Sequence, residues 1–79
     1  MNKEKLAKIR WHCRRGMLEL DVILQNFFDQ HYLQLSSKEQ QIFERLLETE
    51  DQQLYDWFLQ KSQSRNIELA AMVKKIINF

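Results

Sequence analysis

The feature that most constrains the fold of this chain is its near lack of the residues that break helices. The sequence contains no proline and one glycine, Gly16. Proline and glycine mark many turns and helix ends, so a chain that lacks them can form long helical stretches. Apolar residues also recur at spacings of three and four, the period of a helix rather than of a strand. The sequence therefore predicts an all-α fold.

These spacings predict five helices in one domain that spans residues 1–79. A chain of 79 residues is long enough for one domain and too short for two. The short connections favour neighbouring helices that run roughly antiparallel, so we expect a compact five-helix bundle. The expected helices cover approximately residues 2–13, 16–30, 36–48, 52–61 and 66–77.

Polar residues at three of these helix starts are typical of helix caps, which satisfy free backbone amides. The expected caps are Asn2 for the first helix, Ser36 (with Glu39) or Ser37 (with Gln40) for the third, and Asp51 or Thr49 for the fourth.

The apolar stripes also predict the core. In the first helix, Leu6, Ile9 and Cys13 share a face. The segment after the second helix is expected to fold Tyr32, Leu33 and Leu35 back onto the core. The other predicted core residues are Leu20, Leu24, Phe28, Ile42, Phe43, Leu46, Leu54, Trp57, Phe58, Val73 and Ile76.

Composition narrows the class of protein. The net charge of +1 provides no strong attraction for nucleic acid, and we expect none as a partner. Apolar runs are far shorter than the ~20 residues of a membrane helix, so no membrane insertion is expected. The lone cysteine excludes an internal disulfide and fits a reducing compartment, so we expect a cytoplasmic protein.

Residues 1–15 are basic and residues 39–56 acidic, which fits either two solvated faces or a charged end that meets a partner.

The chemistry of an enzyme is not supported by these residues. Cys13 follows His12, but adjacent helical side chains point about 100° apart and do not face each other. Cys13, His12 and His31 lack the paired spacing of metal ligands. One glycine cannot build a nucleotide-binding loop, so neither a catalytic residue, a metal nor a stably bound cofactor is expected.

The segment Arg15-Gly16-Met17-Leu18-Glu19 is the strongest candidate for a working surface. A lone glycine there indicates a bend or a close approach to the backbone. If the second helix extends back through it, Arg15 and Glu19 lie four residues apart and could form an intrahelical ion pair. Alternatively, arginine donors, glutamate acceptors and the nearby Trp11 form a recognition patch.

This segment fits the R-G-x-x-E signature of a known family, and the rest of the chain resembles that family as well. The matching residues are Trp11, Cys13-Arg14-Arg15-Gly16, Glu19-Leu20-Asp21, Phe27-Phe28, the Leu-Ser-Ser start of the third helix, Phe43-x-Arg45-Leu46-Leu47-Glu48 and Asp51-x-x-Leu54-x-x-Trp57. The chain resembles the bacterial assembly factors that promote covalent attachment of FAD to the flavoprotein subunit of succinate dehydrogenase. One departure is Gln52, where many relatives carry a proline.

The resemblance implies a five-helix protein without enzyme activity of its own. The implied partner is the flavoprotein subunit of succinate dehydrogenase, with the fumarate reductase flavoprotein as a second client, and FAD becomes attached to the client. The implied client-binding residues are Arg15, Gly16 and Glu19, with Trp11, Arg14 and Asp21 as neighbours. We expect a monomer. Because some bacterial members have carried a toxin–antitoxin label, an antitoxin-type binding module is the alternative function.

Overall fold

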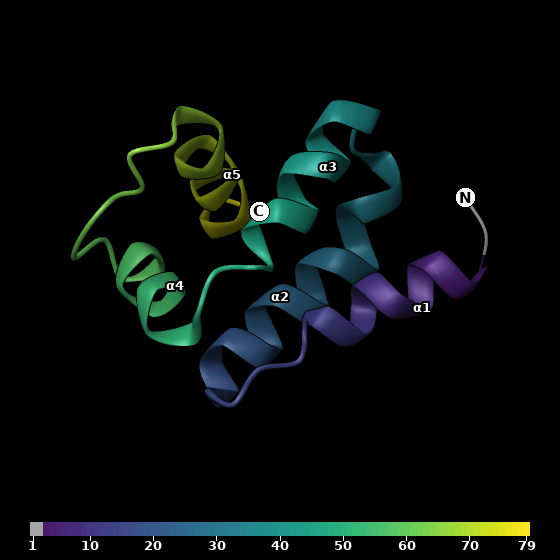
Figure 1. The fold of residues 1–79 in the computed structure, drawn as a ribbon, viewed down its shortest axis with the longest axis horizontal. Helices are drawn as coiled ribbons and strands as arrows, with labels where there is room; N and C mark the ends of the chain where they lie inside the picture. The colour runs from purple at the N-terminus through teal and green to yellow at the C-terminus, as the bar shows by residue number, and fades with distance from the viewer. Residues whose placement is uncertain (1–2) are drawn as a thin grey trace.

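Helices form all of the regular secondary structure in residues 3–79, the part of the chain that the computed structural model describes. There are five α-helices and one short 3-10 helix, with no strand in this part, which confirms the predicted all-α, five-helix fold (Figure 1). In chain order they are α1 (Lys3–His12), α2 (Leu18–His31), η1 (Tyr32–Gln34), α3 (Ser37–Leu46), α4 (Asp51–Phe58) and α5 (Ile67–Ile77).

Among the described residues, side chains cap two helix starts. At α3, the Ser36 hydroxyl accepts from the Glu39 amide at 3.1 Å, and the Glu39 carboxylate accepts from the Ser36 amide at 3.0 Å. This is the first of the two capping boxes expected there. At α5, the Asn66 side chain accepts from the amides of Glu68 and Leu69. The expected cap Asn2 lies outside the described residues.

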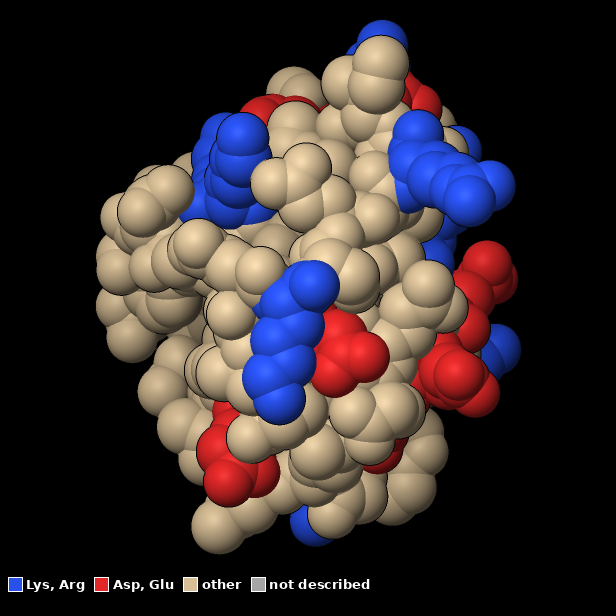
Figure 2. All heavy atoms as spheres, turned by 90° about the vertical axis from the view of Figure 1, so that its left-hand side faces the viewer, with Lys and Arg blue, Asp and Glu red and all other residues tan. Residues whose placement is uncertain are grey.

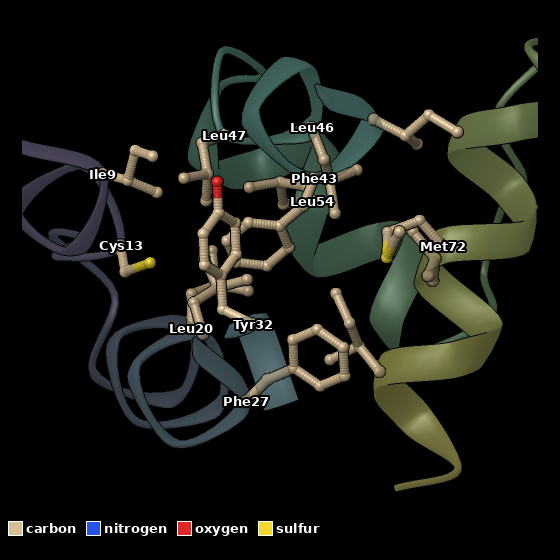
Figure 3. Packing of buried hydrophobic residues seen from close by; sticks show 14 of the residues in the cluster. Ile9, Cys13, Leu20, Phe27, Tyr32, Phe43, Leu46, Leu47, Leu54 and Met72 are labelled. Atoms are coloured by element: carbon tan, nitrogen blue, oxygen red, sulfur yellow. The ribbon is translucent and has the colours of Figure 1, made fainter. Parts of the chain in front are cut away.

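The core lies where all five helices converge, with aromatic rings at its centre (Figure 3). The Tyr32 ring from η1 stands 5.7 Å from the ring of Phe43, centroid to centroid. Ile9 and Cys13 cover one side of these rings, and Met72 from α5 covers the other. A residue directly after α2 thus occupies the centre of the core, which ties the α2–α3 connection to the bundle.

Most of the predicted core is buried, with a few differences. Phe28 and Phe58 are only partly buried and pack on the edge of the core. Tyr32 and Leu35 fold back as expected, but Leu33 is 71% exposed. Residues 32–34 form a 3-10 turn with three residues per turn, so consecutive side chains point in different directions and Leu33 faces solvent. The buried Met72 was not predicted.

In Figure 1, α4 and α5 lie on one side of the molecule, and α1, α2 and α3 lie on the other. α5 packs against α3 and α4, and α2 contacts both α4 and α5. α1 lies beside α2, where the Arg10 guanidinium pairs with the Asp29 carboxylate at 2.9 Å. None of the helices in residues 3–79 has the length and apolar character to span a membrane. The connection between α1 and α2 lies near the start of α4 and carries the candidate site.

Candidate functional site

Arg15 lies in the bend between α1 and α2, and its side chain points into the protein. The side chain is 11% exposed. Its guanidinium donates to the Thr49 carbonyl oxygen at 3.1 Å and to the Leu47 carbonyl oxygen, and it pairs with the Asp51 carboxylate at 3.4 Å. The guanidinium therefore connects the bend to the turn between α3 and α4.

The position of this guanidinium suits the two helix ends beside it. Leu47 and Thr49 follow the last turn of α3, where free carbonyls and the helix dipole favour a positive group. Asp51 begins α4, where the dipole favours a carboxylate. The pair also joins the basic segment 1–15 to the acidic segment 39–56. The attraction between these segments thus includes a specific ion pair, between Arg15 and Asp51.

Two carboxylates hold consecutive backbone amides of the bend. The Arg15 amide donates to Asp21 Oδ1 at 3.1 Å, and the Gly16 amide donates to Asp51 Oδ2 at 3.0 Å. Asp21 also accepts from the Gln25 side chain at 2.6 Å. Because Asp21 belongs to α2 and Asp51 to α4, the bend is fixed from two helices.

This arrangement corrects the expectation that Asp51 or Thr49 caps α4. The N-cap residue is Glu50, and its side chain makes no cap hydrogen bond. The Asp51 carboxylate instead serves the bend, and the Thr49 carbonyl accepts from Arg15. The intrahelical Arg15–Glu19 pair does not form either, because α2 begins at Leu18 and Arg15 turns towards α3 and α4.

Gly16 does not have the backbone conformation that favours glycine. Its φ lies outside the left-handed region. A Cβ built on Gly16 would lie 3.5 Å from Asp51 Oδ2, an ordinary van der Waals contact. An alanine would therefore fit the folded chain. Gly16 is exposed, so the missing side chain leaves the backbone open to close approach from outside.

Besides Gly16, three predicted site residues at or beside the bend are exposed. Glu19 lies in the first turn of α2 and, within the described chain, has no hydrogen bond or ion pair. Trp11 is 65% exposed, and the Arg14 guanidinium stands 5.2 Å from its ring centroid, a cation–π contact. A shallow hollow of about 340 Å³ lies beside Trp11 and Arg14, lined by Trp11, His12, Arg14, Arg15, Leu47 and Glu48.

The structure thus places the six predicted site residues in two layers. Gly16, Glu19, Trp11 and Arg14 are exposed, whereas Arg15 and Asp21 lie partly buried and bind the backbone. Sequence reasoning missed the part played by Asp51, whose partner Gly16 is 35 residues away. No local pattern connects the two positions; the opposite charges of their segments were the one available signal.

Cys13 and the His, Asp and Glu side chains are the residues that could react or hold a metal. Cys13 is fully buried, and this burial raises the pKa of its thiol to about 12, which keeps the thiol protonated and unreactive near neutral pH. Among residues 3–79, no three His, Cys, Asp or Glu side chains are grouped to hold a metal ion.

On the face formed by α4, α5 and their connection, charged side chains are separated by wide uncharged areas (Figure 2).

Comparisons with known proteins agree on one family. A family described as "Flavinator of succinate dehydrogenase" matches residues 7–79. Proteins named FAD assembly factor SdhE are similar to this chain. The one from Aliivibrio fischeri is 46% identical over 94% of this chain and 86% of its own length. The one from Shewanella oneidensis is 46% identical over 96% of this chain and 93% of its own length.

The fold is similar to that of a solved relative as well. A solution structure described as a UPF0350 protein has a TM-score of 0.80 and 43% sequence identity, and the match covers 99% of this chain and 84% of that one. The agreement of sequence and fold over nearly the whole chain confirms the resemblance that the R-G-x-x-E segment indicated. This chain belongs to the family of succinate dehydrogenase flavinators, the FAD assembly factors.

Proposed function

We propose that this protein binds the flavoprotein subunit of succinate dehydrogenase and promotes covalent attachment of FAD to that subunit. The observation that carries the proposal is the family match over residues 7–79. The relatives' name, FAD assembly factor, describes the same task. In this proposal the protein acts in the cytoplasm as a monomer and is not an enzyme. The fumarate reductase flavoprotein is its second client.

The exposed residues at the bend suit such a contact. Gly16 has no side chain to keep a client backbone away, and Glu19 offers two carboxylate oxygens to client donors. Trp11 and Arg14 offer an aromatic ring and a planar cation, residue types that often anchor protein interfaces. We propose that these four residues contact the client, with Arg15 and Asp21 behind them.

Binding alone is enough to raise the rate of flavin attachment. A protein that binds the reactive conformation of its client more tightly than the unreactive one raises the population of the reactive conformation. A preference of ~1.4 kcal/mol raises a minor population about tenfold. The client's own side chain and the flavin supply the covalent chemistry. The assembly factor therefore needs no cofactor site of its own.

The first experiment compares Glu19→Ala with Glu4→Ala in cells that lack the chromosomal copy of this protein. Glu4 is a matched control because it is also an exposed glutamate in the first turn of a helix, but at the far end of α1 from the bend. The measurement is covalent flavin on the succinate dehydrogenase flavoprotein, read by flavin fluorescence in a denaturing gel. Glu19→Ala should lower it about tenfold or more, as the loss of a charged hydrogen bond predicts.

Each variant loses one exposed carboxylate from the first turn of a helix, so the two melting temperatures should fall alike and by roughly 4 °C or less. No larger loss is expected for Glu19→Ala, because Glu19 has no hydrogen bond or ion pair within the described chain. Full flavinylation with Glu19→Ala would contradict a client contact at this residue. Affinity capture of the parent, followed by the same assay on the fumarate reductase flavoprotein, tests the second client. If that subunit is not captured and its covalent flavin does not change, the proposal of a second client is wrong.

A further inference from the structure

We infer that Asp51 is a positioning residue that holds the bend in the shape in which Glu19 meets the client. Asp51 does so from α4, although the bend lies between α1 and α2. The inference rests on the proposed function for the identity of the client. Its structural part, that Asp51 holds the bend, stands on contacts within this chain.

Both oxygens of the Asp51 carboxylate bind the bend. Oδ2 accepts from the Gly16 amide at 3.0 Å, and Oδ1 pairs with the Arg15 guanidinium at 3.4 Å. The Asp51 side chain is 30% exposed, so these contacts are partly withdrawn from water. Contacts of a charged group in such surroundings are stronger than on the open surface. One side chain thus fixes two consecutive residues of the bend.

The fixed backbone leads directly into the helix that carries Glu19. Asp21 holds the Arg15 amide from the α2 side, and Asp51 holds the next amide from the α4 side. The Met17 carbonyl then accepts from the Asp21 amide at 3.0 Å, which starts the hydrogen-bond series of α2. Glu19 follows Met17 by two residues. Loss of the Asp51 contact therefore removes one of the two contacts that hold the backbone leading to Glu19.

The start of α4 shows that the hydrogen bonds of this carboxylate go to the bend rather than to its own helix. Glu50 occupies the N-cap position without a side-chain cap hydrogen bond. The adjacent Asp51 carboxylate accepts from Gly16 and Arg15 and not from an α4 amide. Helix α4 therefore begins without the side-chain cap that α3 and α5 both have. That difference is expected if the carboxylate is required elsewhere.

The first test measures hydrogen exchange of the Gly16 amide in the protein alone. Asp51→Ala removes its acceptor, so its protection should fall about tenfold, while amides in the middle of α3 and α5 keep theirs. Asp51→Asn is the second variant, because it keeps the shape and removes the charge. Glu50→Ala is the matched control: the neighbouring acid is exposed, and its side chain makes no hydrogen bond or ion pair with the described residues of the bend. Unchanged Gly16 protection in both Asp51 variants would overturn the inference.

The second test is a double-mutant cycle on the affinity for the flavoprotein subunit. Asp51→Ala alone should weaken binding about fivefold or more, and it should add less than about twofold once Glu19→Ala is present. This coupling is the result that a general loss of stability would not produce. If Asp51→Ala weakens binding by the same factor in both backgrounds, Asp51 does not act through Glu19 and the inference is overturned.

The two tests separate this inference from the proposed function. If the parent does not bind the flavoprotein, the proposed function fails, and with it the client part of the inference. The exchange measurement still decides whether Asp51 holds the bend. If the parent binds and the Asp51 variants bind equally well, the proposed function stands and the positioning role fails.

Discussion

The bend at Gly16 and the turn at Gln60 join helices in opposite ways. Gln60 follows α4 with a φ of 63°, the left-handed region that disfavours every residue with a Cβ. The turn around it is held by backbone bonds, from the Gln60 amide to the Trp57 carbonyl at 3.1 Å and from the Lys61 amide to the Asp56 carbonyl at 2.9 Å. This is a Schellman motif, in which glycine is the usual residue.

At the bend the reverse holds. Gly16 lies outside the left-handed region, and the bend is held by side chains from α2 and α4. The one glycine of the chain is therefore absent from the turn where the backbone favours it and present where the backbone does not require it. The difference is expected if Gly16 serves the approach of a client, as proposed above, whereas the left-handed Gln60 is a local conformational strain that the fold tolerates.

The largest expected effect comes from removing the side chain that holds the bend. Arg15→Ala deletes donors to two carbonyls and a carboxylate in a partly buried place, so the free energy of unfolding should fall by about 2–3 kcal/mol. Urea denaturation measures it. Arg65→Ala is the control, because Arg65 is an exposed arginine between α4 and α5 and should change stability by less than about 0.5 kcal/mol. If both variants unfold alike, the two connections are held in the same way and the contrast is wrong.

A smaller effect of opposite sign is expected at the turn. Gln60→Gly relieves the left-handed conformation, so the free energy of unfolding should rise by about 0.5–1 kcal/mol after the entropic cost of glycine. The same denaturation measures the gain, and covalent flavin on the client should be unchanged. A loss of stability would show that the Gln60 side chain contributes contacts that outweigh its backbone strain.

The smallest effect on stability is expected from Gly16→Ala. The new Cβ meets Asp51 Oδ2 at an ordinary distance, so the free energy of unfolding should change by less than about 0.5 kcal/mol. Client binding, measured beside it, should weaken, and Gly16→Arg should weaken it further because a long side chain blocks close approach. A folded Gly16→Arg protein that binds the client as the parent does would remove the reason for assigning Gly16 to the surface.

Sequence reasoning succeeded where the deciding interaction is local. The capping box of Ser36 and Glu39 needs residues three positions apart, and the stripe that buries Leu20 and Leu24 needs a helical period. It failed at Leu33, because a short 3-10 turn interrupts that period. These successes were sufficient for the five-helix fold.

The candidate site was predictable only in part. The segment from Arg15 to Glu19 could be found because the glycine, the charges and the family signature lie close together in sequence. The direction of each side chain could not, because it depends on contacts with Leu47, Thr49 and Asp51 that form only after the chain folds back. The sequence around a charged residue in a bend does not show whether its side chain points outward or inward.

The contacts of Arg15 also have a consequence for the order of events during protein synthesis. A ribosome makes the chain from its N-terminus, so the bend is made well before the segment that holds it. The carbonyls of Leu47 and Thr49 and the carboxylate of Asp51 are not available to Arg15 and Gly16 until the beginning of α4 has been translated. A nascent or truncated chain that carries the whole R-G-x-x-E segment but stops before α4 therefore lacks the finished bend. The R-G-x-x-E segment can therefore adopt its final conformation only after most of the chain has been synthesised and folded.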